Sequence, residues 1–100
     1  MKLLTKELIN RFAKIGKQED GNPIIICKFF NPTGAGTWYA TELDPTCNIF
    51  YGYVSIFGDE NDEWGHFSLE ELQNYRGRFG LGIERDLNFT EARFEDIVKR

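Results

Sequence analysis

Four side chains of the types used in acid–base catalysis are spread along the sequence. They are one histidine and three carboxylates: Glu42, His66, Glu84 and Asp86. General acid–base catalysis needs such groups within hydrogen-bond reach of one substrate. A small hydrolase or metal-dependent enzyme built on these residues therefore requires that the fold bring all four into one concave pocket.

The sequence predicts no metal site. The set closest to a calcium-binding loop is Asp59, Asn61, Glu63 and Glu70. Its spacing fits, but the loop position that needs glycine for a sharp turn is occupied by Trp64. The possible zinc ligands Cys27, Cys47 and His66 include no closely spaced pair such as Cys-x-x-Cys. They are also too scattered to indicate a cysteine nucleophile, so we expect no metal and no other cofactor.

Arg85 stands between two acids, Glu84 and Asp86, in a segment with the alternation of a strand. An arginine in this position can pair across a sheet with Glu42, or it can anchor the carboxylate or phosphate of a ligand. We favour the structural ion pair, and the ligand remains the alternative.

The charge distribution excludes some functions. The net charge is −4, but residues 29–75 contain no Lys or Arg and eight acidic residues. Affinity for nucleic acid comes largely from Lys and Arg contacts with phosphate, so we expect no direct binding to nucleic acid. Such a segment can instead present phosphate-like charge to a basic partner protein.

Aromatic residues make up 15% of the chain, and several fall in the predicted sheet. On a sheet they could stack on nucleic-acid bases, but such platforms also supply cations, and only Lys28 is near. We expect one face of these rings to form the core and the other to bind a protein. The candidate partner-binding residues are Trp38, Tyr39, Glu42, Asp59, Glu60, Asp62, Glu63, Glu84, Arg85 and Asp86.

The pattern of apolar residues predicts one α+β domain over residues 1–100. Thr5 can cap a helix over 5–15, and Ser68 with Glu71 forms a capping box for a helix over 69–76 that Gly77 ends. A last helix should follow Thr90. The predicted strands are 24–30, 37–43, 49–54, a short 63–67 and 83–89.

These elements predict an antiparallel meander of four to five strands with two or three helices, in the order α-β-β-β-(β)-α-β-α. The helices 5–15 and 69–76 should cover one face of the sheet. We expect no membrane span and, from the charged N-terminus and the two unpaired cysteines, a cytoplasmic protein.

Several blocks together resemble one bacterial family. They are Lys28-Phe29-Phe30, Trp38-Tyr39-Ala40-Thr41-Glu42, Asp44-Pro45, Phe50-Tyr51-Gly52, Gly65-His66-Phe67-Ser68-Leu69, Glu71-Leu72, Arg76-Gly77 and Ile83-Glu84-Arg85-Asp86-Leu87 with Phe89. Their order and spacing, over about residues 3–89, resemble the domain of unknown function 2958 family. The resemblance implies no activity and no site residue. It implies a setting among the accessory genes of plasmids and integrative elements.

Two hypotheses account for these features. The first is a non-enzymatic protein-interaction module of a mobile element, an inhibitor of a host defence or nucleic-acid-binding protein that acts through its acidic and aromatic surface. The second is the small enzyme built on the four acid–base residues. We favour the first, because a chain of 100 residues with one histidine offers little material for a catalytic site.

Overall fold

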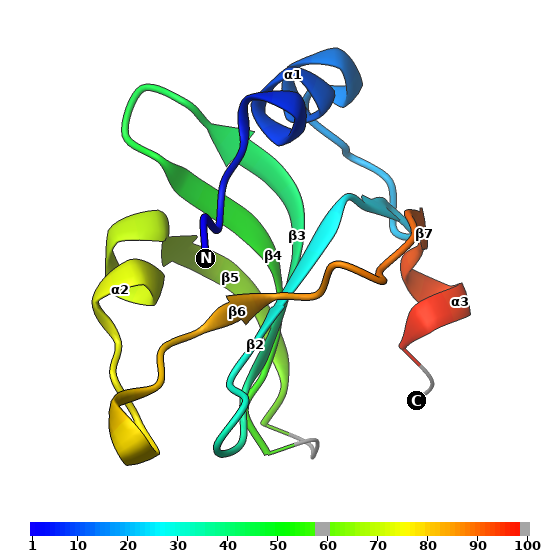
Figure 1. Ribbon diagram of the computed structural model, residues 1–100. Coiled ribbons are helices and arrows are strands. Elements are labelled where there is room, and N and C mark those ends of the chain that lie inside the picture. The colour runs from blue at the N-terminus through cyan, green and yellow to red at the C-terminus, as the bar shows by residue number, and fades with distance from the viewer. Residues whose placement is uncertain (58–60, 99–100) are drawn as a thin grey trace.

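The computed structural model describes residues 1–57 and 61–98 and has an α+β fold. Its centre is a five-stranded antiparallel sheet (Figure 1). In spatial order the strands are β5 (Glu63–Ser68), β4 (Ile49–Ser55), β3 (Thr37–Asp44), β2 (Cys27–Phe30) and β6 (Glu84–Arg85). The predicted meander of residues 24–54 is therefore confirmed, and the short strand expected at 63–67 is its edge strand.

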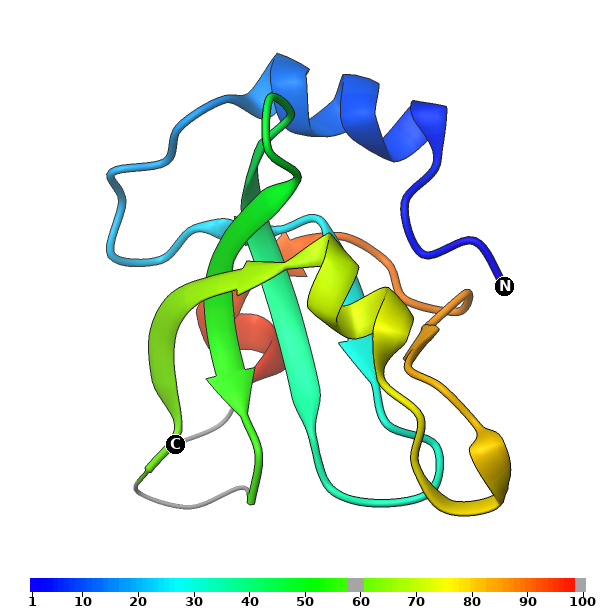
Figure 2. The same cartoon turned by 90° about the vertical axis from the view of Figure 1, so that its left-hand side faces the viewer.

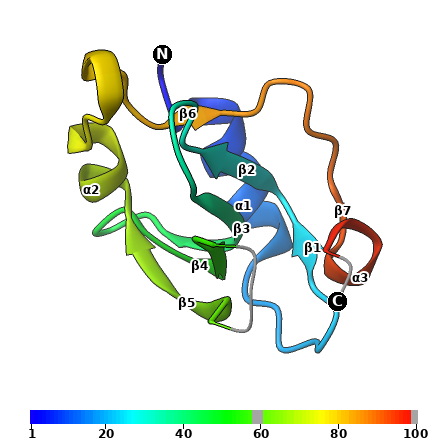
Figure 3. The same ribbon diagram turned by 90° about the horizontal axis from the view of Figure 1, so that it is seen from below.

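Helices cover both faces of this sheet. Helices α1 (Lys6–Ile15) and α2 (Leu69–Asn74) lie on one face, as predicted, and α3 (Phe94–Ile97) lies on the other. Figure 2 shows α2 in front of the sheet and α3 behind it, and Figure 3 shows the strands between these two helices. We call the two sides the α1/α2 face and the α3 face.

The first two helices begin where their capping residues predict. Thr5 Oγ1 accepts a hydrogen bond from the N–H of Leu8, and Ser68 Oγ accepts one from the N–H of Glu71. Helix α1 ends at Gly16, whose φ of 70° is readily adopted by glycine. Helix α2 ends earlier than predicted, because Tyr75 is already extended and its N–H closes the last turn on the carbonyl of Glu71.

The predicted strand 24–30 divides between two sheets. Strand β1 (Ile24–Ile25) pairs with β7 (Ala92–Arg93) in a separate two-stranded sheet, whereas β2 belongs to the main sheet. The break falls at Ile26, whose N–H bonds the carbonyl of Ala40.

The C-terminal region differs most from the prediction. Of the strand expected over 83–89, only β6 forms; Asp86 then accepts a hydrogen bond from the N–H of Asn88 and turns the chain, which leaves Leu87 69% exposed. The helix expected after Thr90 is replaced by β7 and the short α3, since β1 supplies a pairing partner for this segment. A distant side chain caps α3: Asn22 Oδ1 accepts from the N–H of Glu95.

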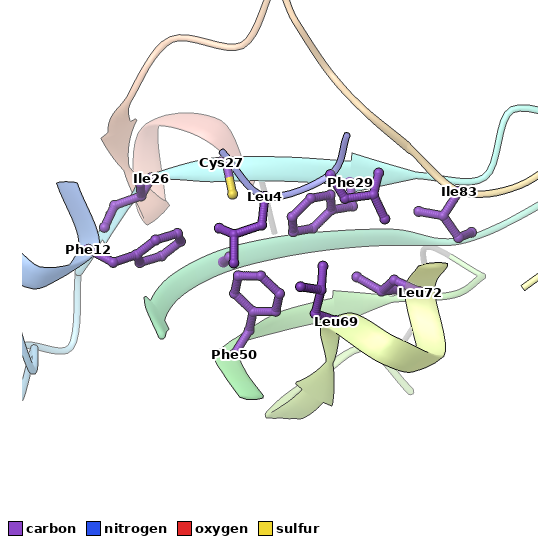
Figure 4. Close-up of a cluster of buried hydrophobic side chains, with 11 residues drawn as sticks. Leu4, Phe12, Ile26, Cys27, Phe29, Phe50, Leu69, Leu72 and Ile83 are labelled. Atoms are coloured by element: carbon purple, nitrogen blue, oxygen red, sulfur yellow. The ribbon is translucent and has the colours of Figure 1, made fainter. Parts of the chain in front are cut away.

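The larger core lies on the α1/α2 face around Phe50, which is fully buried. Its ring centroid is 5.3 Å from those of Phe29 and Phe67 and 5.8 Å from that of Phe12 on α1. Leu69 and Leu72 of α2 complete this core (Figure 4). On the α3 face, Phe94 packs against Tyr53 and Trp64 at centroid distances of 4.9 and 4.8 Å.

A β-bulge between β3 and β4 makes Gly52 necessary. The pairing register shifts between Ala40 and Glu42, and Thr41 is buried with its hydroxyl donating to the carbonyl of Tyr51. A Cβ at position 52 would lie 1.9 Å from the carbonyl oxygen of Tyr39. Only glycine allows this approach.

Gly52→Ala should therefore destabilise the protein by more than about 3 kcal/mol, beyond ordinary overpacking, because the clash is with backbone. Gly65 is its direct cross-strand neighbour, and a Cβ there meets nothing within 4 Å. Gly65→Ala is the matched control and should change stability by no more than about 1 kcal/mol. Urea unfolding measures both, and equal effects of the two substitutions would contradict the close approach.

Candidate functional site

The four acid–base residues of the enzyme hypothesis do not converge. Glu42 on β3 and His66 on β5 line one cleft of about 440 Å³ together with Cys47 and Tyr51. Glu84 lies on β6, at the opposite edge of the sheet, and Asp86 follows it. Within residues 1–57 and 61–98, no three His, Cys, Asp or Glu side chains are placed to hold a metal ion.

The carboxylates of this cleft stabilise turns. Glu42 Oε2 accepts a hydrogen bond of 2.9 Å from the N–H of Gln18, in the loop after α1. Asp44 Oδ1 accepts from both the hydroxyl and the N–H of Thr46, at 2.6 and 3.0 Å. The hydroxyl and N–H of Thr46, with a smaller contribution from the thiol of Cys47, lower the pKa of Asp44. A carboxylate held in its ionised form by a turn is a poor general acid.

Arg85 does not pair with Glu42. Strand β6 pairs with β2, so β2 separates Arg85 from β3. Asp86 lies on the other side of the strand, with Oδ2 3.8 Å from Nζ of Lys28. No carboxylate of the described chain lies within 4 Å of the Arg85 guanidinium, and no described group accepts a hydrogen bond from its buried Nε. The favoured ion pair is therefore not formed, which leaves the ligand alternative.

The predicted partner-binding residues fall in several places. Trp38 and Glu63 share the α1/α2 face, because both align with Val54 in one row across the sheet. Tyr39 and Asp62 lie together on the α3 face. Burial, and secondarily the charge of Asp62, raises the pKa of Tyr39. Asp62 also accepts a hydrogen bond of 2.8 Å from Ser55.

The remaining residues of that set lie elsewhere. Glu42 and Asp44 lie at the end of β3 that joins the hairpin turn, whereas Trp38 and Glu63 lie near its other end. Glu84 lines a separate cleft together with Arg76. Asp59 and Glu60 are outside the described residues.

An apolar groove of about 350 Å³ lies between α2 and the α1/α2 face of the sheet. Trp38 and Phe67 supply its sheet side, and Leu72 and Tyr75 its helix side. The only acidic or basic side chain among the residues described as lining it is Glu71. We call this site the α2 groove.

Sequence reasoning identified Trp38 in this groove but missed Ile56 and Tyr75, which are 38% and 43% exposed. Ile56 lies beyond the predicted strand 49–54, and Tyr75 lies inside the predicted helix 69–76 but just beyond the end of α2. Phe57 follows Ile56 and is 74% exposed. The high aromatic content of the chain is the signal that could have found such residues, since a core of this size cannot bury every ring.

The two cysteines occupy opposite environments. Cys27 is buried beside Arg85, and Cys47 is exposed in the β3–β4 turn. Burial raises the pKa of the Cys27 thiol from 9.0 to about 12, against a smaller lowering by the positive charge of Arg85. Above pH 9.0 the unfolded chain therefore releases a proton that the folded protein keeps.

The free energy of unfolding should fall between pH 9.0 and about 12 because of Cys27. The expected contribution is about 1.4 kcal/mol per pH unit in the middle of that range. Urea unfolding at several pH values measures it, and Cys27→Ala should remove this slope while Cys47→Ala keeps it. Parallel profiles of the wild type and Cys27→Ala would show that burial does not shift the thiol.

None of the helices within residues 1–57 and 61–98 is long and apolar enough to cross a membrane. Comparison with curated proteins and with solved structures gives no match. One family model matches over residues 2–95, and its description is "Protein of unknown function (DUF2958)". Since this match spans nearly the whole chain and agrees with the resemblance of the sequence blocks, the protein belongs to the DUF2958 family.

Proposed function

We propose that the protein is a non-enzymatic interaction module, and that its α2 groove binds an apolar segment of a partner protein that also carries positive charge. The observation that carries this proposal is the groove itself: an apolar concavity with half-exposed Trp38, Ile56 and Tyr75 at its surface.

The apolar lining supports a protein ligand. Tyr and Trp are enriched at protein interfaces, where they supply large contact areas at low cost in conformational entropy. A groove of about 350 Å³ accommodates one or two side chains of a partner. Phe57, exposed immediately after Ile56, extends the apolar surface beyond the groove.

The charges around the groove favour a basic partner. Glu71 lines it, and Glu63 lies two strands from Trp38 in the same cross-strand row, at a distance of about 10 Å. No Lys or Arg occurs among the described residues of the lining. Acidic groups beside an apolar site increase the rate of association with a basic surface and disfavour acidic partners.

Basic surfaces are typical of proteins that bind nucleic acids. We therefore propose such a protein as the partner, with inhibition of a host defence factor by an accessory protein of a mobile element as the biological role. The carboxylates of Glu63 and Glu71 at and near the groove support a positively charged partner. The enzyme hypothesis receives no comparable support, because its four residues do not meet in one pocket.

Selection of peptides from a random display library on the intact protein tests the groove. Selected peptides should combine aromatic or aliphatic residues with Lys or Arg, and their binding should weaken as salt is raised. Reversing the charge of Glu63 and Glu71 together, by Glu63→Lys and Glu71→Lys, should weaken these peptides by about five- to tenfold per reversed charge.

Glu70→Lys is the matched control, because Glu70 is exposed on the same helix but does not line the groove. It should leave peptide affinity within about twofold of the wild type. Ile56→Asp should abolish selection by placing a charge in the apolar lining. Acidic peptides, or peptides that bind the Ile56→Asp variant equally well, would refute the proposed site.

A further inference from the structure

A second cavity, of about 450 Å³, lies between α1 and the segment that connects β6 to β7. Figure 1 shows this segment in orange, passing below α1. Cys27, the first residue of β2, and Ile26 before it also line the cavity. The cavity shares no residue with the α2 groove, so a ligand bound in it does not depend on the proposed function.

The cavity contains one cation without a counter-charge, Arg85. This residue lies on the α1/α2 face, because it pairs with Phe29 across the sheet. Its Nε is buried without an acceptor among the described residues, and no described carboxylate lies within 4 Å of the guanidinium. A partly buried guanidinium without a partner is energetically unfavourable, and an anion bound there would relieve this cost.

The second arginine of the cavity is already paired. Nε and Nη2 of Arg11 donate to both carboxylate oxygens of Glu91, at 2.8 to 3.1 Å. This fork-to-fork pair joins α1 to the segment on the other side of the cavity. Arg85 is therefore the guanidinium available to a ligand.

The lining restricts the charge that the cavity can accept. Three acidic residues are among those that line it. Glu91 is paired with Arg11, and the carboxylate of Asp86 lies toward Lys28, so Glu7 is the lining acid without a described ion pair. Its charge disfavours a dianion such as phosphate, whereas a single carboxylate carries less charge and matches the two donors of one guanidinium edge.

The rest of the lining is apolar and matches a hydrocarbon body. Its apolar side chains are Leu8, Ile26, Leu87 and Phe89. A cavity of this volume is in the range of small-molecule sites, which combine an apolar lining with a few polar groups that fix the orientation of the ligand.

We propose that this cavity binds an apolar monocarboxylate, with the carboxylate on Arg85 and the hydrocarbon against the four apolar side chains. A small free acid and the C-terminal carboxylate of a peptide share this chemistry. The acid would accept two hydrogen bonds from the guanidinium edge and add the missing negative charge.

Titration of the intact protein with phenylacetate, followed by NMR, tests the proposal. Saturable shifts are expected at the methyl groups of Leu8 and Ile26 and at the Nε–H of Arg85, with a Kd on the order of 1 mM for so small a ligand. Phenylacetamide has the same shape without the charge and should bind at least about tenfold more weakly. Inorganic phosphate should give weaker shifts than phenylacetate.

Arg85→Gln should weaken phenylacetate binding by about tenfold or more. It should not lower the thermal stability of the unliganded protein, because the Arg85 side chain forms no ion pair with a described carboxylate and its Nε has no described acceptor. Arg78→Gln, which removes an exposed arginine outside the cavity, is the matched control and should bind as the wild type does. Should Arg85→Gln fail to fold, the comparison of phenylacetate with phenylacetamide on the native protein still tests whether the cavity recognises the carboxylate.

A short peptide ending in a free phenylalanine carboxylate distinguishes the two sources of the ligand. Tighter binding than phenylacetate indicates the end of a chain, and weaker binding indicates a free acid. The proposal is overturned by equal affinity for acid and amide, by unchanged affinity of Arg85→Gln, by stronger binding of phosphate, or by an absence of saturable shifts at these groups.

Discussion

Adjacent residues of a β-strand point to opposite faces of a sheet, and in this protein both faces are covered. The rest of the structure depends on this constraint. Phe50 and Tyr53 of one strand enter two different cores, one closed by α1 and α2 and the other by α3. A chain of this size can build two such cores only because its strands are rich in aromatic residues, which bury a large area per residue.

The same alternation divides the predicted interaction surface. Trp38 and Tyr39 are neighbours in sequence but lie on opposite faces. Trp38 lies on the same face as Glu63 and α2, whereas Tyr39 lies near Asp62 on the α3 face. An acidic and aromatic segment that looks continuous in the sequence thus becomes two separate surfaces, and the one beside α2 contains the apolar groove.

The sequence predicts best those helices and strands whose formation depends on residues close to them in the chain. The caps at Thr5 and Ser68 and the three central strands lie where expected, since capping and alternation are read within a few residues. The errors fall where a distant partner decides. Ile24–Ile25 leaves the main sheet because Ala92–Arg93 pairs with it, and no pattern within either segment indicates that pairing.

The candidate sites were predictable to a smaller extent for the same reason. Arg85 was recognised as an unusual cation, but its neighbours depend on strand order, and β6 joins β2 and not β3. Glu42 was recognised as a candidate base, but the loop after α1 uses its carboxylate through Gln18. In both cases the residue type was informative, and its role was decided by a segment far away in the chain.

The wall of the Arg85 cavity is the least regular part of its surroundings. Between β6 and β7 the chain has no helix or strand, and its links to α1 and β2 include the hydrogen bond from Asp86 N–H to the carbonyl of Lys28 and the ion pair of Arg11 with Glu91. Both members of that pair are about one-third exposed, so solvent and salt weaken it. Segments held by few contacts open at low free energy, and binding sites are commonly found in them. The segment is also tied to the α3 face, because Phe89 packs against the core there and β7, which follows, pairs with β1.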